Sequence, residues 1–177
     1  MSVFVKPRVS APRPHRLVEI ANQYSKLRLD RREVVRAIHL LDEYFGQTAT
    51  QPSRPRPLVC PPGELSLVFL SDPALAQLHA DFLNDPSSTD VITFEGDPAL
   101  GSAGEVCVSV DTALAYARKH CRDFATELTL YVVHGWLHLA GYDDLEPAKK
   151  RVMRRAETRA LRVLVEHAGV PAFSLRK

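Results

Sequence analysis

The sequence is short of three features that would each indicate a class of protein. Its 177 residues contain only three cysteines, Cys60, Cys107 and Cys121, which are far apart and form no Cys-x-x-Cys pair. An odd number of isolated cysteines argues against a disulfide framework, so we expect small buried hydrophobic side chains there. No apolar run approaches the roughly 20 residues that cross a bilayer. The formal net charge of +2 is too small to indicate nucleic-acid binding by itself.

The beginning of the chain also lacks the continuous apolar core of a signal peptide. Residues 1–15 combine basic side chains with three prolines, which favours a loose N-terminal arm. We therefore expect a cytoplasmic protein with no membrane partner. The contents of 45% hydrophobic and 25% charged residues are typical of one globular domain at this length. We place that domain at 16–170, followed by a short tail at 171–177.

Hydrophobic patterning predicts alternating strands and helices along that domain. The predicted strands span 17–22, 65–70, 89–94 and 105–110. Five helices are predicted, and the first four follow caps at Asp30, at Ser71 or Asp72, at Asp111, and at Asp123 or Thr126. They end near Phe45, near Phe82, near Cys121 and before Gly141, and the last helix begins near Pro147 and reaches about His167. The third and fourth strands lie on either side of a glycine-rich turn, which indicates a hairpin. Prolines between Gly46 and Gly63 predict a loop insertion over 46–63.

The apolar faces of three helices can also be predicted from helical spacing. The first helix has a stripe of Val34, Ile38, Leu41 and Phe45. The side chains off that stripe form a mixed charged face that is typical of solvated helices: Arg31, Arg32, Arg36, Asp42 and Glu43. We expect the second and last helices to turn the following residues inward: Leu75, Leu78 and Phe82, and then Val152, Ala156, Val163 and Leu164.

The most informative stretch is HGWLHLAGYDD, residues 134–144. His134 and His138 are four residues apart on a predicted helix, so both imidazoles lie on one face and can bind one metal ion. Gly141 predicts a turn after the helix that can bring Asp144 back towards that face. Two imidazoles and one carboxylate suit a catalytic zinc, because structural zinc usually has four protein ligands.

The sequence of this stretch also allows other interpretations. Two histidines at helical spacing are common by chance. The protease motif has glutamate directly after the first histidine, and Gly135 stands there, which argues against a peptidase. No general base is certain; Asp143, His120 and Glu105 are the alternatives. For Asp143 we favour a role other than general base, in which its carboxylate orients a ligand histidine.

The stretch HGWLHLAGYDD, with STDVITF and GEVCVSV before it, resembles the YbeY family of rRNA maturation factors, whose motif runs HGxLHLxGYDH. This resemblance implies an α+β fold in which a small mixed sheet of about four strands packs against helices. It also implies a zinc-dependent, single-strand-specific endoribonuclease that acts in 16S rRNA 3′-end maturation and ribosome quality control. The implied partners are single-stranded rRNA, the small ribosomal subunit and assembly proteins, with no DNA.

Carried over by position, the resemblance makes His134 and His138 zinc ligands that act in catalysis through the metal. Asp144 stands in place of the third histidine, as a carboxylate ligand to the same single zinc ion. Leu83 stands where family members often have an arginine, so other cations must bind the RNA phosphates. The candidates for that role are Arg118, Lys119, Lys150, Arg151, Arg154 and Arg155.

Two alternatives to a ribonuclease follow from the same residues. The first is a non-catalytic ribosome-assembly or RNA-binding factor in which the metal only stabilises the turn after the motif helix. The second is a metallohydrolase of small or peptide substrates, for which we expect a deep apolar pocket beside the metal.

Overall fold

The structure is a computed structural model that describes residues 15–49, 58–83 and 89–176. The predicted N-terminal arm therefore lies outside the described residues, apart from its last residue. Much of the predicted loop insertion lies outside them as well. At its beginning the loop prediction is wrong, because Gly46–Ala49 form the last turn of the first helix.

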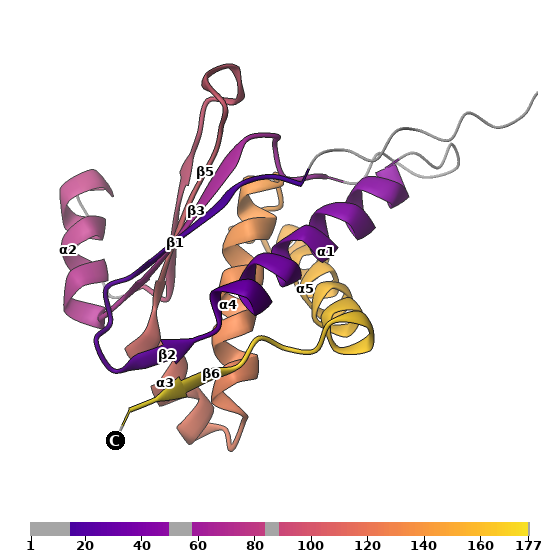
Figure 1. Cartoon of the computed structure of the whole chain (residues 1–177). Coiled ribbons are helices and arrows are strands. Elements are labelled where there is room, and N and C mark those ends of the chain that lie inside the picture. The colour runs from indigo at the N-terminus through magenta and orange to yellow at the C-terminus, as the bar shows by residue number, and fades with distance from the viewer. Residues whose placement is uncertain (1–14, 50–57, 84–88, 177) are drawn as a thin grey trace, which may run out of the picture.

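The architecture is α+β, as predicted (Figure 1). The strands are β1 Val18–Asn22, β2 Leu27–Leu29, β3 Glu64–Leu70, β4 Val91–Glu95, β5 Ser102–Ser109 and β6 Phe173–Leu175. The helices are α1 Arg31–Ala49, α2 Asp72–Leu83, α3 Val110–Lys119, α4 Phe124–Leu139 and α5 Pro147–His167, with a 3-10 turn at Pro98–Leu100.

Four strands form a mixed sheet in the order β1-β3-β5-β4. The strands β1, β3 and β5 are parallel to one another, and β4 runs antiparallel to β5. The β4–β5 pair confirms the predicted hairpin. A second, two-stranded sheet joins β2 to β6, with Leu27 opposite Leu175. The predicted tail at 171–177 is therefore wrong for Phe173–Leu175, which pairs with a strand near the other end of the domain.

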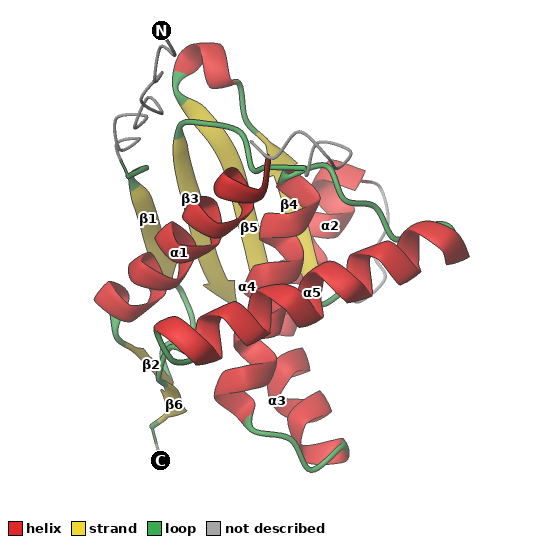
Figure 2. Cartoon of the chain, turned by 90° about the vertical axis from the view of Figure 1, so that its right-hand side faces the viewer, coloured by secondary structure: helices red, strands yellow, loops and turns green. Residues whose placement is uncertain are grey.

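Helices cover both faces of the four-stranded sheet. On one face α1, α4 and α5 lie together, and α2 lies on the other (Figures 1 and 2). The larger core contains the buried side chains of α1, α4 and α5 together with Val106 and Val108 of β5. The smaller core joins Leu75 of α2 to Cys107 of β5. Successive residues of β5 therefore point to different helical layers, as the alternation of a strand requires.

The central helix α4 is buried nearly all round, which agrees with its apolar sequence. Its N-cap is Asp123, whose carboxylate accepts from the backbone N–H of Thr126. Midway along the helix, Gly135 lies against β5, and a Cβ there would stand 2.3 Å from Cγ1 of Val106. The absence of a side chain at this position lets the helix approach the sheet closely.

Most of the predicted core residues are buried, including the whole apolar stripe of α1. Phe82 is 64% exposed and Val152 is 52% exposed, so both inward predictions are wrong. In α5 the neighbouring Met153 is buried instead of Val152, whereas Ala156, Val163 and Leu164 are buried as predicted. Cys121 is also exposed, unlike the two other cysteines.

The charged face predicted on α1 is not wholly solvated. Asp42 accepts hydrogen bonds from the guanidinium of Arg16, at 2.5 and 2.9 Å, and from the indole N–H of Trp136 at 3.2 Å. Burial raises the pKa of the Asp42 carboxyl, and Arg16 opposes that rise. This ion pair ties the segment before β1 to α1 and α4.

Among the described residues, no helix is both long and apolar enough to span a bilayer.

Replacing Gly135 by alanine tests the close approach of α4 to the sheet. The added methyl group collides with Val106, so we expect the free energy of unfolding to fall by about 1–3 kcal/mol. Urea unfolding measures this change. The control is Gly46→Ala in α1, where a Cβ meets nothing within 4 Å and where we expect a gain of about 0.5–1 kcal/mol. Equal effects at the two glycines would contradict this account of the packing.

Candidate metal centre

The end of α4 brings the predicted ligands together. Gly141 has a φ of 93°, and its N–H donates to the carbonyl of His138 at 2.8 Å. The N–H of Tyr142 donates to the carbonyl of Leu137 at 3.0 Å. A left-handed glycine with these bonds closes the helix and turns the chain back along it. Asp144 thereby returns to the histidine face, as the sequence predicts.

His134, His138 and Asp144 form a compact group of donor atoms. The two histidine Nε2 atoms are 3.0 Å apart. The Asp144 carboxylate oxygens lie 3.7 Å from His138 Nε2 and 4.0 Å from His134 Nε2. Ligand atoms around a tetrahedral zinc, with bonds of about 2.0–2.1 Å, are about 3.4 Å apart. The three distances lie on both sides of that value, so the group fits a metal ion.

Both imidazoles are held by their other nitrogen. His134 Nδ1 is 2.7 Å from Oε1 of Glu157 on α5, and His138 Nδ1 is 3.1 Å from the carbonyl of Tyr142. A carboxylate and a carbonyl can only accept, so each Nδ1 carries the proton and donates it. Each Nε2 then has a lone pair directed at the centre, the arrangement in which histidines usually bind metals.

The short Nε2–Nε2 distance needs a cation to be stable. Two lone pairs at 3.0 Å repel each other unless a proton or a metal ion lies between them. Burial lowers the pKa of His134, but the hydrogen bond and charge of Glu157 outweigh burial and raise it. Burial and the neighbouring His134 lower the pKa of His138. Glu157 therefore makes His134 the more basic of the two rings.

Glu157 was missed by the sequence reasoning, although a signal for it exists. It is one of two acidic residues in α5, and it lies between the buried Ala156 and Ala160 on the border of the apolar face. A carboxylate at such a position needs a partner on a neighbouring element. Its partner could not be named before the packing of α5 on α4 was known.

The residues proposed as general bases lie away from the donor group or have other partners. Asp143 accepts from Lys149 Nζ at 2.8 Å and from the N–H of Leu145 at 2.9 Å, and the orienting role predicted for it belongs to Glu157 and the Tyr142 carbonyl. Glu105 accepts from the thiol of Cys107, which packs on the α2 side of the sheet, so a role for Glu105 at the metal is wrong. His120 caps α3 and packs on Tyr116.

The predicted RNA-binding cations fall into two groups. Arg118 and Lys119 end α3, and four residues connect them to Phe124, the first residue of α4. Ten residues of helix separate that residue from His134, which is about 15 Å. The structure therefore does not bring these two cations to the metal centre. Leu83, in place of the family arginine, is the last residue of α2 and precedes the undescribed segment 84–88.

The cations of α5 lie closer to the metal centre. Lys150 and Arg154 share a helix face with Glu157, because they precede it by seven and three residues. Arg151 and Arg155 lie further round the helix, and all four side chains are exposed. The first pair is therefore the better placed to contact a substrate at the metal.

Comparison with known proteins shows the family of the chain. Residues 19–165 match the family described as Endoribonuclease YbeY. The chain belongs to the YbeY family. A relative named Endoribonuclease YbeY from Protochlamydia amoebophila is 42% identical over 100 residues, which cover 54% of this chain and 67% of that protein. Another with the same name, from Chlamydia trachomatis, is 40% identical over 113 residues, covering 60% and 70%.

A solved structure supports the fold of the YbeY-family chain. This chain is similar to the solution structure of TM1509 from Thermotoga maritima, with a TM-score of 0.55 and 22% sequence identity. The likeness covers 85% of this chain and 90% of that one. The family match lies inside the predicted domain at 16–170, whose exact limits stay a prediction.

Removing the carboxylate of Glu157 tests its orienting role. We expect Glu157→Ala to lower the affinity for zinc by about 10–100-fold, because His134 loses the acceptor that fixes its ring and raises its basicity. Competition with a chromophoric chelator measures the affinity. The matched control is Glu166→Ala, an exposed glutamate of the same helix, which should leave affinity unchanged. A similar loss in both variants would argue against an orienting role.

Proposed function

We propose that this YbeY-family chain is a zinc-dependent, single-strand-specific endoribonuclease in rRNA maturation. Its proposed role is 16S rRNA 3′-end processing and ribosome quality control in the cytoplasm, with the small ribosomal subunit and assembly proteins as partners. The observation that carries the proposal is the group of His134, His138 and Asp144, in which both Nε2 atoms face one point. Zinc fits the donor set better than magnesium or calcium, since two of the three donors are imidazoles.

The accessibility of the ligands favours a catalytic role over a structural one. Their side chains are 19%, 27% and 29% exposed for His134, His138 and Asp144 respectively. Three protein ligands leave a coordination position open, whereas structural zinc sites are closed by four. The arrangement supports a site that substrate and water can reach.

Bound zinc would polarise a phosphodiester and lower the pKa of a coordinated water towards about 7. The chain's own contribution is to hold the ligands in place. Glu157 fixes the ring of His134, and the Tyr142 carbonyl fixes that of His138. Both bonds keep the Nδ1 protonated and the Nε2 free, so neither ring has to change its tautomer when metal or substrate binds.

The charge of the centre makes nearby cations necessary. Asp144 and Glu157 together carry two negative charges, which balance a divalent ion. A phosphodiester entering the centre therefore meets little net positive charge from it. Lys150 and Arg154, on the face of α5 that carries Glu157, are the residues we assign to phosphate binding near the cleavage site.

Loss of a metal ligand tests the proposed activity. We expect His138→Ala to reduce cleavage of a single-stranded RNA containing the 16S 3′ region by more than the roughly 100-fold typical of an orienting residue. Chelation should abolish cleavage of the same RNA, and added zinc should restore it. Gel analysis of end-labelled RNA measures the rate. His120→Ala is the control and should change the rate by no more than about twofold, since His120 is exposed at the end of α3.

Each rival reading predicts a different result. A non-catalytic assembly factor would bind zinc and ribosomal subunits, and it would leave the RNA intact. A hydrolase of other substrates would cleave small esters or peptides and spare the RNA. Cleavage that persists unchanged in His138→Ala would indicate a contaminating nuclease and would remove the support for this activity.

A further inference from the structure

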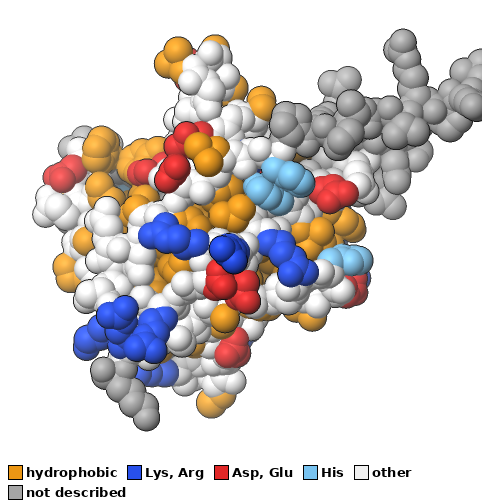
Figure 3. Space-filling model, viewed as in Figure 1, with side chains coloured by type: hydrophobic (Ala, Val, Ile, Leu, Met, Phe, Trp, Pro, Cys, Tyr) orange, Lys and Arg blue, Asp and Glu red, His pale blue; other side chains and the backbone are white. Residues whose placement is uncertain are grey.

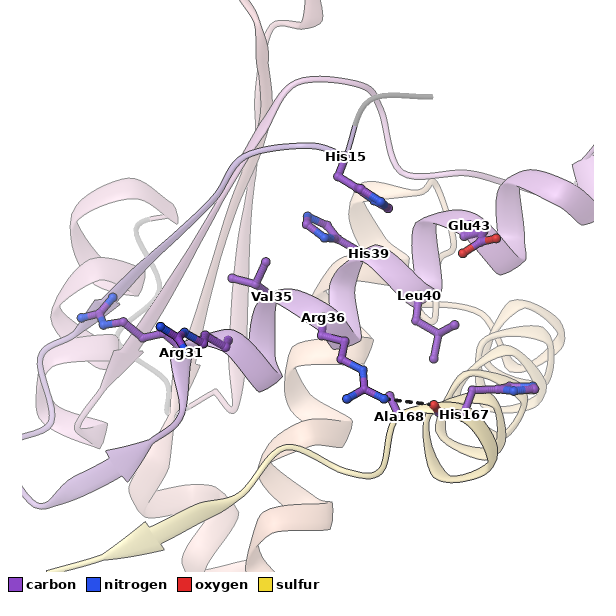
Figure 4. Close-up of a pocket in the computed structure, with 10 residues that line it drawn as sticks. His15, Arg31, Val35, Arg36, His39, Leu40, Glu43, His167 and Ala168 are labelled. Carbon is purple, nitrogen blue, oxygen red and sulfur yellow. Dashed lines mark hydrogen bonds between the residues drawn. The ribbon is translucent and has the colours of Figure 1, made fainter. Parts of the chain in front are cut away.

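A groove lies on the outer face of α1 (Figure 4), and none of its lining residues belongs to the metal centre. Its volume is about 490 Å³. The segment before β1 contributes His15 to the lining, and the end of α5 contributes His167 and Ala168. Apolar side chains of Val35 and Leu40 line it together with Ala168, and the remaining lining residues are polar or charged.

The groove carries a concentration of positive charge. Arg31, Arg32 and Arg36 line it, with Glu43 as the one carboxylate in the lining, so its net charge is +2 with neutral histidines. Basic side chains and histidines lie near one another over α1 on this face, with acidic side chains beside them (Figure 3). Among the described residues, none of the three arginines forms an ion pair with a carboxylate. Their charges remain available to an anionic ligand.

Backbone carbonyls position two of these arginines. Arg31 donates to the carbonyl of Ile20, and Arg36 donates to that of His167 at 3.3 Å (Figure 4). A guanidinium has five N–H donors, so each arginine keeps further donors for a ligand. The neutral partners limit the movement of the side chains without cancelling their charge. Less conformational entropy is then lost when an anion binds.

A pair of stacked histidine rings lines the groove. The rings of His15 and His39 are 4.5 Å apart and inclined by 22°. Nε2 of His39 is 2.9 Å from the carbonyl of Arg16, which fixes the orientation of that ring. Flat aromatic and imidazole rings are surfaces on which unpaired bases stack. Arginines beside stacking rings are the combination that single-stranded nucleic acid requires.

The groove is separate from the metal centre. Both contain a part of α5, but Glu157 contacts His134 whereas His167 lines the groove. Ten helical residues separate them, which corresponds to about 15 Å along the helix. A ligand in the groove therefore does not occupy the position of the scissile phosphate.

We propose that this groove binds a single-stranded segment of the RNA substrate outside the cleavage site, with phosphates on Arg32 and Arg36 and a base on the His15–His39 pair. This assignment rests on the proposed ribonuclease function. Arg32 and Arg36 are four residues apart, about 6 Å along α1, so they can contact different phosphates of one strand. The contacts are to backbone and ring faces, so the groove favours single strands without selecting a base sequence.

The double variant Arg32→Gln/Arg36→Gln tests the groove in the full chain. Fluorescence anisotropy with a labelled single-stranded RNA, in the presence of chelator, measures binding without cleavage. We expect about a tenfold weaker affinity at 50 mM salt. The slope of log affinity against log salt should become shallower by about 1.4, or about 0.7 for each lost phosphate contact. A His39→Ala variant should weaken binding with little change of slope, since it removes stacking and no charge.

The matched control is Lys26→Gln/Arg176→Gln, which removes two exposed charges at the β2–β6 sheet, outside the groove. We expect RNA affinity and slope to stay near those of the unmodified chain. Equal losses in the two double variants would mean that total charge matters and would overturn the proposal. So would an Arg32→Gln/Arg36→Gln variant that binds as tightly as the unmodified chain.

Cleavage assays separate this proposal from the proposed function. If the groove variants lose RNA affinity while the chain cuts no RNA, the groove stands and the ribonuclease assignment fails. If the chain cuts RNA and the variants bind and cut as before, the groove assignment fails alone. If both the groove assignment and the ribonuclease assignment are correct, the groove variants should raise KM with kcat nearly unchanged, because their metal ligands are intact.

Discussion

The contact between Gly135 and Val106 determines how deeply α4 lies on the sheet. With no side chain at residue 135, the helix backbone rests against β5, and the apolar residues on its other sides meet α1 and α5. His134, directly before this glycine, then lies within hydrogen-bond distance of Glu157 on α5, and His138 lies beside His134. The metal centre therefore depends on a packing contact made by a neighbouring residue that has no chemistry of its own.

Much of this arrangement could be predicted from local sequence. Helical spacing predicts that His134 and His138 share a face, and a glycine at the helix end predicts the reversal that returns Asp144. The four main strands and five helices have apolar periods long enough to identify them. These features depend on residues close together in the chain, and the structure confirms them.

What could not be predicted depends on contacts between distant segments. The strands β2 and β6 have three residues each, too few for a period, and they are stabilised by each other across the length of the domain. Strand alternation predicts that Glu105 and Val106 point to opposite faces of the sheet. Only the packing of α4 on Val106 shows which face lies on the side of the metal centre. The groove on α1 is formed by residues from three distant segments, which include His15 and His167. In the sequence these segments are far apart, and the arginines of α1 are therefore predicted to form only a solvated helix face.

The helix α5 contributes Glu157 to the metal centre and His167 to the groove. If the metal ion and the RNA segment bind as proposed, both bind surfaces that include α5. Any free energy by which the metal ion stabilises the packed position of α5 would then also favour binding in the groove, and thermodynamic linkage would make this coupling equal in both directions. RNA affinity would in that case depend on metal loading, so preparations that differ in metal content would also differ in RNA binding.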